Sequence, residues 1–117
     1  MTNLLPDRNP LYVALSDGGI RNGYTLKILN KLHEPHTFEI KLDGLPDARL
    51  TLTGYERAAT PALTVATDVL GEVRLFVGVP AASLKALTPQ AHTFSVIVRD
   101  TQTGQTIAHK TVFRRPL

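Results

Sequence analysis

Two histidines and a glutamate stand close together in residues 33–36, which read His-Glu-Pro-His. Imidazole and carboxylate groups bind Cu(II) or Zn(II) when the fold brings them to one point. The proline and the spacing of the histidines exclude the helical zinc motif of metalloproteases. Because this segment supplies too few ligands, we assign no metal site, keep His33 and His36 as candidate ligands, and take a polar turn as the simpler interpretation. His92 and His109 are the remaining histidines that the fold could bring near.

No other group of residues has the types and spacing of a catalytic site. Ser16, Ser83 and Ser95 stand outside any Gly-x-Ser-x-Gly elbow, and the acids are scattered singly. The chain contains no cysteine, which excludes a thiol nucleophile, a disulfide and an iron-sulfur cluster held by this chain. The glycine pair at 18–19 lacks the Lys-Ser/Thr of a phosphate loop. We therefore expect a chain that is not an enzyme by itself and that holds no cofactor.

Length and composition are typical of one globular domain. A chain of 117 residues with 43% hydrophobic residues has enough surface to bury for one core, so we expect one domain over residues 1–117 with a lead-in segment over 1–9. The net charge is +3, but 13 basic residues are dispersed among 10 acidic ones, whereas nucleic-acid binding needs a clustered positive face. No apolar run approaches the roughly 20 residues of a membrane-spanning helix. We expect a soluble domain that binds no nucleic acid.

The stretch over residues 7–31 shows the strand-and-turn pattern that the rest of the chain repeats and that would position the candidate residues. It predicts a short strand at 11–15, a glycine-marked turn at 16–19, and a long strand at 24–32 that alternates apolar and polar residues. An Asn-Gly pair at 22–23 predicts a second turn or bulge just before the long strand. This stretch therefore reads as strand, turn and strand.

Three residues of the same stretch have expected local roles. Arg8 is expected to form an ion pair that fastens the lead-in segment and discourages edge pairing between molecules; a partner-binding patch is the alternative. The Asn22 side chain is expected to bond the backbone within its turn. Tyr24 is expected to pack inward and to hold its hydroxyl at the rim of the core.

Alternating apolar residues continue through the rest of the chain. Further strands are predicted at 37–42, 48–53, 61–66, 72–79, 91–100 and 105–114, with residues 67–71 as a connection and one or two helical turns at 80–87. About seven short strands predict an all-β domain of two packed antiparallel sheets, with a closed barrel as the alternative. The pattern leaves open which face of the last strand enters the core. We expect one dry core containing Tyr24, Leu26, Ile28, Phe38, Ile40, Phe94, Val96 and Val98.

A resemblance to a known family narrows this interpretation. The segment DRNPLYVALSDGGIRNGYTLKILNK at 7–31, followed by HTFEIKLDGLP at 36–46, closely resembles the C-terminal domain of the FixG/CcoG family of membrane iron-sulfur proteins. The likeness is most detailed at 7–10, 16–18 and 20–24, and it becomes generic beyond residue 54. It implies an immunoglobulin-like antiparallel β-sandwich.

The same resemblance implies a place and a role. In that family this domain follows the last membrane helix and lies in the periplasm, while the cysteine motifs for two 4Fe-4S clusters stand upstream. The family assists assembly of cbb3-type cytochrome c oxidase and is linked to copper handling. The resemblance therefore implies a non-catalytic periplasmic domain of an inner-membrane protein that docks a protein partner, such as an oxidase subunit or a copper chaperone. The alternatives are a copper-binding domain that uses His33 and His36, and a structural spacer.

Overall fold

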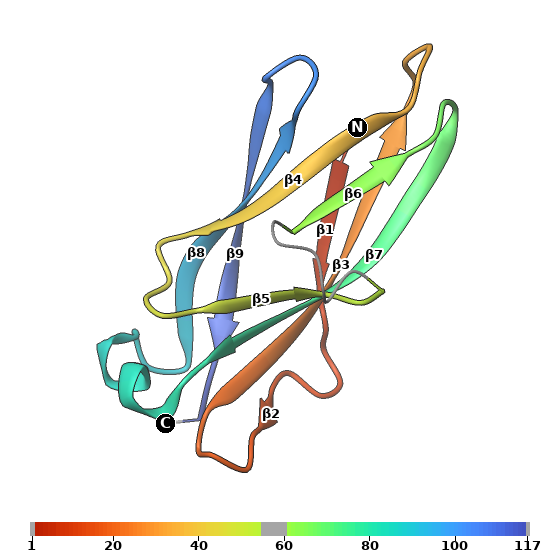
Figure 1. The fold of residues 1–117 in the computed structure, drawn as a ribbon. Coiled ribbons are helices and arrows are strands. Elements are labelled where there is room, and N and C mark those ends of the chain that lie inside the picture. Colours follow the sequence, from red (N-terminus) through yellow and green to blue (C-terminus); the bar gives the residue numbers. More distant parts are fainter. Residues whose placement is uncertain (1, 55–60, 117) are drawn as a thin grey trace.

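Two antiparallel sheets face each other across one core (Figure 1). The computed structural model describes residues 2–54 and 61–116. One sheet has the strand order β1-β3-β7-β5, with β2 also paired to β3, and the other has the order β6-β4-β8-β9. The bounds are β1 Thr2–Pro6, β2 Val13–Ala14, β3 Ile20–Asn30, β4 His36–Asp43, β5 Arg49–Leu52, β6 Ala62–Val65, β7 Val69–Val79, β8 Ala91–Asp100 and β9 Thr106–Arg114. The predicted all-β sandwich is confirmed, with nine strands in the described residues where about seven were expected.

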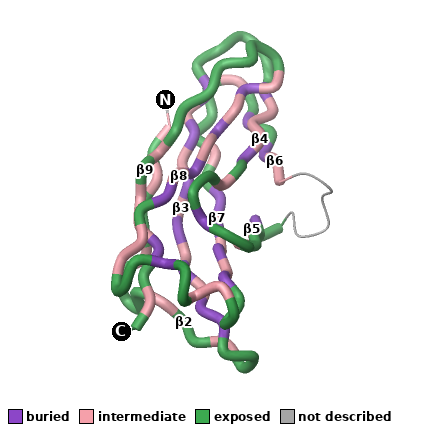
Figure 2. The backbone as a smooth tube through the Cα atoms, turned by 90° about the vertical axis from the view of Figure 1, so that its left-hand side faces the viewer, coloured by how far each residue is buried: buried purple, intermediate pink, exposed green. Residues whose placement is uncertain are grey.

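The core lies between the central strands of the two sheets. In β3 every second residue is buried, because one face of a strand packs on the opposite sheet while the other meets solvent. Figure 2 shows this burial along β3, β7 and β8, with mainly exposed residues along β9. Of the expected core residues, all but Phe38 are buried, and Phe38 packs half-buried against the same core.

The last strand contributes its odd-numbered residues to the interior. Phe113 is fully buried, Thr111 and His109 are half-buried, and Ile107 is 49% exposed. The inward phase that the sequence left open is therefore the one containing Phe113. Burial decreases along this phase toward Ile107, where β9 borders a pocket between the sheets.

The prediction of a lead-in segment over residues 1–9 missed a strand, because residues 2–6 of it form β1. Thr2–Pro6 pairs with β3, with Thr2 opposite Ile28 and Pro6 opposite Tyr24. The amide of Asp7 donates to the Gly23 carbonyl. The backbone amides and carbonyls of the odd-numbered residues of β1 therefore point toward β3, and the backbone of Pro6 points toward the outer edge. A proline at that position removes no ladder hydrogen bond.

The predicted turn at Asn22-Gly23 is also wrong. β3 begins at Ile20 and pairs without interruption with β7, from Ile20 opposite Val79 to Asn30 opposite Val69. The chain reverses earlier, where the Leu15 amide donates to the Gly19 carbonyl at 2.8 Å. The same ladder starts β7 at Val69, inside the segment that was predicted as a connection.

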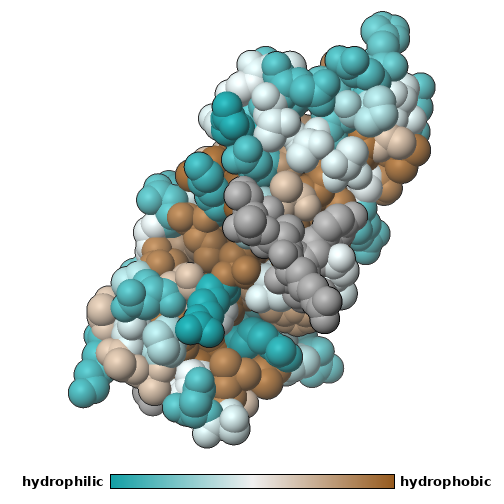
Figure 3. All heavy atoms as spheres, in the orientation of Figure 1, coloured by the Kyte–Doolittle hydropathy of each residue, from teal (hydrophilic) through white to brown (hydrophobic). Residues whose placement is uncertain are grey.

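One short helix links the sheets. The 3-10 helix η1, Ala81–Ala86, leads from β7 to β8, which confirms the predicted helical turns. Among the described residues, no helix has the length and hydrophobicity needed to cross a membrane. Figure 3 shows hydrophobic side chains gathered between β4 and β5, on the side of the sandwich opposite the β1 and β9 edges. A pocket lined by Ile40, Leu42, Leu45 and Leu50 adjoins these two strands.

Candidate functional site

The side chains of Asn22 and Tyr24 fasten β3 to the edge strand β9 of the opposite sheet. The Asn22 amide donates to the Arg114 carbonyl at 2.9 Å, and its oxygen accepts the Arg114 amide at 2.8 Å. The Tyr24 hydroxyl donates to the Val112 carbonyl at 2.7 Å. Tyr24 is fully buried rather than at the rim, and burial raises the pKa of its hydroxyl. These contacts cover the C-terminal part of the outer edge of β9.

The same contacts fix the direction of every backbone group in β9. Asn22 binds the amide and carbonyl of Arg114, and Tyr24 binds the carbonyl of Val112. The backbone amides and carbonyls of these even-numbered residues therefore point away from β8. In an antiparallel pair these directions alternate. The amides and carbonyls of Thr106, Ala108 and Lys110 therefore also point outward, and within the described chain they have no hydrogen-bond partner. We call these three residues the open edge.

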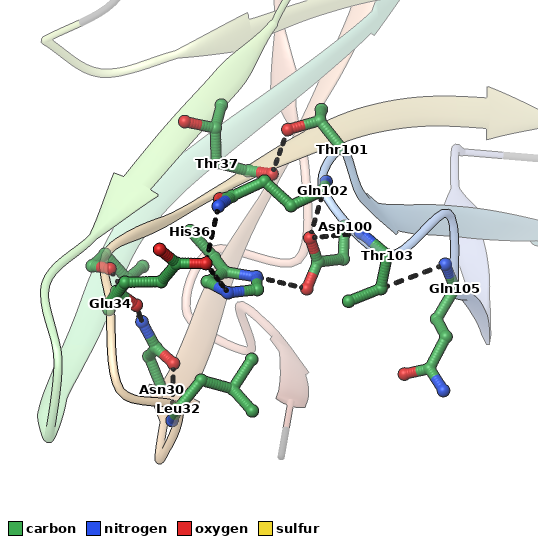
Figure 4. Close-up of polar contacts among 11 residues, drawn as sticks. Asn30, Leu32, Glu34, His36, Thr37, Asp100, Thr101, Gln102, Thr103 and Gln105 are labelled. Carbon is green, nitrogen blue, oxygen red and sulfur yellow. Dashed lines mark hydrogen bonds and ion pairs between the residues drawn. The ribbon is translucent and has the colours of Figure 1, made fainter.

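A second polar group surrounds His36 at the end of the sandwich where the β3–β4 loop meets the β8–β9 hairpin (Figure 4). His36 is buried, and its Nδ1 lies 2.6 Å from the Asp100 Oδ2 atom. The other Asp100 oxygen accepts the amides of Gln102 and Thr103. Glu34 approaches the far side of the ring, with its Oε1 atom 3.8 Å from Nε2. The arrangement ties a loop to a hairpin.

The hydrogen bonds at Asp100 keep its carboxylate charged. Burial acts to raise the pKa of this group, but hydrogen bonds from the Gln102 amide, the His36 ring and the Thr103 amide outweigh burial and hold the pKa below its usual range. A carboxylate accepts hydrogen bonds and cannot donate them. His36 therefore carries its proton on Nδ1 and donates it to Asp100.

The structure does not bring the predicted metal ligands together into a site. His33 is exposed, and the Nδ1 atom of His36 is engaged by Asp100. His92 bonds the Gly44 carbonyl at the far end of β4, and His109 bonds the Thr2 hydroxyl. Among residues 2–54 and 61–116, no cluster of three or more metal-binding side chains is present. Copper titration of the domain beside a His33→Ala, His36→Ala variant remains the test of the metal hypothesis.

Asp7, rather than Arg8, fastens the beginning of the chain to the sheet. Both Asp7 carboxylate oxygens accept from Arg74 on β7 at 2.6 Å, and these bonds outweigh burial to lower the pKa of Asp7. Arg8 is exposed and forms no ion pair within the described residues. The Asp7–Arg74 pair lies over Gly23, where a Cβ atom would meet the Asp7 carboxylate and come within 3.0 Å of the Arg74 guanidinium.

Replacing Gly23 by alanine should lower the free energy of unfolding by about 1 kcal/mol, because the new methyl group displaces a well-formed but partly exposed ion pair. Urea denaturation measures the change. The matched background is Asp7→Ala, in which the methyl group meets no carboxylate, so Gly23→Ala should cost clearly less there. Equal costs in both backgrounds would show that the ion pair does not explain the glycine.

Comparison with known proteins identifies the family. Residues 1–116 match the family model described as "IG-like fold at C-terminal of FixG, putative oxidoreductase". The chain belongs to the FixG C-terminal domain family. It is 29% identical over 116 residues to nitrogen fixation protein FixG of Rhizobium meliloti and 34% identical over 115 residues to protein RdxB of Cereibacter sphaeroides. These matches cover 97% and 95% of the chain but only 22% of each relative.

A solved structure shares the fold of this FixG-type domain. The crystal structure of a FixG-related protein from Vibrio parahaemolyticus superposes with a TM-score of 0.80 at 20% identity, covering 100% of this chain and 96% of that one. The predicted family and the immunoglobulin-like sandwich are thus confirmed. The chain spans about a fifth of the length of FixG and RdxB.

Sequence reasoning missed two features of the FixG-type domain. Asp100 ends a predicted strand just before the Thr-Gln-Thr-Gly hairpin, and an aspartate there often accepts the next backbone amides; that signal could have drawn attention to it. The open edge has no comparable signal, because alternation describes the faces of a strand and not whether its edge is paired.

Proposed function

We propose that this domain is a non-catalytic protein-interaction module of a larger FixG-type protein. The observation that carries the proposal is the open edge on β9, where three residues present backbone donors and acceptors in one line. Folded proteins generally pair or block such edges, because an extended chain can add to them as a further strand. The side chains of Asn22, Tyr24 and Asp100 hold the fold together, which leaves the open edge as the best-supported surface for function.

The domain acts, in this proposal, on the periplasmic side of the inner membrane during assembly of cbb3-type cytochrome c oxidase and the associated copper handling. The family resemblance supports this placement. Alkaline phosphatase fused to the C-terminus of the full-length parent should be active in cells, whereas a fluorescent-protein fusion that matures only in the cytoplasm should stay dark. The reverse pattern would contradict the periplasmic location.

Binding is tested by titrating the domain against purified oxidase subunits and periplasmic copper chaperones. Isothermal calorimetry should detect at least one partner with a dissociation constant in the tens of micromolar or tighter. A periplasmic protein from an unrelated pathway serves as the control and should give no heat of binding. If every candidate behaves like that control, the interaction role is wrong and the spacer alternative is favoured.

A further inference from the structure

We propose that the open edge and the pocket beside it bind an extended peptide of alternating pattern, apolar toward the domain interior and acidic on the outside. This inference rests on the proposed interaction role and names the site and the class of partner. Three independent features support it: the outward direction of alternate backbone groups on β9, the lining of the pocket beside them, and the charge on the solvent-facing side of β9.

The backbone groups of the open edge are spaced to pair with an extended peptide strand. Thr106, Ala108 and Lys110 alternate along β9, and each directs one amide and one carbonyl outward. Donor and acceptor positions repeat every second residue, which is the spacing that another β-strand offers. Pairing over five residues spans about 17 Å, the length of a typical strand in a folded protein. The site therefore matches a short extended segment.

A pocket of about 260 Å³ opens between the sheets beside this edge. Its apolar lining comes from both sheets and includes Ile28, Phe38, Val98 and Ile107. Ile107 is 49% exposed and belongs to the inward phase of β9. Residues that lie opposite one another on paired strands share a face, so a peptide residue opposite Ile107 directs its side chain into this pocket. That residue should be apolar and of moderate size.

Two buried polar side chains at the pocket wall, Asn30 and Asp100, already have hydrogen-bond partners. Asp100 is held by His36 and two backbone amides, and the Asn30 amide donates to the carbonyls of Glu34 and Val65. A charged group placed against these two side chains would find their hydrogen-bonding atoms occupied and would lose its hydration. This strengthens the preference for an apolar side chain.

The solvent-facing side of β9 determines which residues are favoured at the outward-pointing positions of the peptide. Lys110 is exposed and has no ion pair within the described residues, and the residue opposite it on β8 is the uncharged Ser95. A peptide residue on the outward phase beside Lys110 is therefore favoured as aspartate or glutamate. A second copy of the chain would bring its own Lys110 and a net charge of +3 to this edge, and a lysine on an edge strand opposes such self-pairing.

Two contacts limit the length of the site. Asn22 occupies both outward groups of Arg114 and Tyr24 occupies the carbonyl of Val112, so an added strand cannot continue past them. β1 approaches β9 where the Thr2 hydroxyl lies 2.7 Å from the Nε2 atom of His109. The peptide must therefore pair mainly along the N-terminal half of β9, and affinity should be modest.

The test uses the acetylated and amidated peptide Val-Glu-Phe-Glu-Val, titrated into the isotope-labelled domain and followed by amide chemical shifts in NMR. The expected result is a saturable shift of the Thr106, Ala108 and Lys110 amides together with Ile107. Two control peptides should give no such pattern: the scrambled Val-Phe-Glu-Glu-Val, and the original sequence carrying N-methyl groups on alternate residues, which removes its strand-pairing donors.

Two variants of the domain locate the site. Ala108→Pro removes an outward amide without removing a bond to β8, and it should weaken binding by about tenfold, with Ala108→Ser as the matched control that binds like the wild type. Lys110→Glu leaves the exposed backbone in place and should weaken binding of the acidic peptide. It should also restore binding to a peptide in which lysine replaces glutamate.

The outcomes separate this inference from the proposed function. Binding of the probe that Ala108→Pro and Lys110→Glu leave unchanged, or no shift on β9 at millimolar peptide, would overturn the peptide site. Concentration-dependent shifts of β9 without peptide would identify a second copy as the occupant and would equally overturn it. If an oxidase subunit or chaperone binds Ala108→Pro as tightly as the wild type, the interaction role stands and the edge is not its site.

Discussion

Replacing Asp100 by alanine should lower the free energy of unfolding by about 3 kcal/mol, because a buried hydrogen-bonding centre is removed and its partners are left unsatisfied. The substitution strips acceptors from the His36 ring and from the Gln102 and Thr103 amides. His36 is buried, so water does not readily replace the lost acceptor. Urea denaturation followed by far-UV circular dichroism measures the change.

The matched control is Asp100→Asn. Its side-chain oxygen keeps an acceptor for the Gln102 and Thr103 amides, while its amino group opposes the proton on His36 Nδ1. The loss should therefore be smaller, about 1–2 kcal/mol. An alanine variant as stable as the wild type would show that the polar cluster does not hold the loop and hairpin together.

Acid should weaken the wild-type domain through the same carboxylate. The pKa of an aspartate in an unfolded chain is about 3.9, and the pKa of Asp100 in the folded domain lies below its usual range. The stabilisation is therefore fully present above the unfolded value and is lost as the pH falls through the folded value. Stability measured between neutral pH and strong acid should decline less steeply for Asp100→Asn than for the wild type. Parallel declines would exclude Asp100 as a cause.

Replacing Tyr24 by alanine should be the most damaging single change, with a loss of about 3–5 kcal/mol, because a large buried aromatic residue leaves a cavity. The ring is fully buried and meets Phe94 edge to face at a centroid distance of 5.9 Å. Its hydroxyl also bonds the Val112 carbonyl, so the variant loses both core packing and one contact between the sheets. Thermal and urea unfolding should both show the loss.

Tyr24→Phe separates these two contributions. It keeps the ring and removes only the hydroxyl, so the expected loss is about 1 kcal/mol. The amides near Val112 and Arg114 should exchange faster in this variant, because one of the contacts that hold β9 is gone. If Tyr24→Phe were as unstable as Tyr24→Ala, the hydroxyl rather than the packing would dominate.

Period-two burial made most of the fold predictable. Leu26, Ile28, Val96 and Val98 recur at every second position of their strands, and this pattern identifies an inward face wherever one side of a strand is covered. The Asn-Gly pair at 22–23 misled the interpretation, because the usual turn signal was overridden by contacts from distant residues. Asn22 is satisfied by Arg114, ninety-two positions away in the chain, and Gly23 makes room for the Asp7–Arg74 pair.

The candidate site was less predictable because it depends on sheet order. Which strands lie at an edge follows from long-range pairing, and the local pattern of residues 105–114 is the same for a central or an edge strand. The closeness of His36 and Asp100 likewise arises from the pairing of β4 with β8, in which Phe38 lies opposite Asp100. The resemblance to the FixG family supplied the fold and the proposed role, but it named neither of these features.

Residue-by-residue amide hydrogen exchange in the free, monomeric domain tests the central claim that the outer edge of β9 is open over half its length. We expect fast exchange at the open edge and slow exchange at Ile107, His109, Thr111 and Phe113, whose amides face β8. Exchange should be slow again at Arg114, whose amide Asn22 binds. Uniformly slow exchange from Thr106 to Lys110 would show that this edge is already paired and would rule out the open edge.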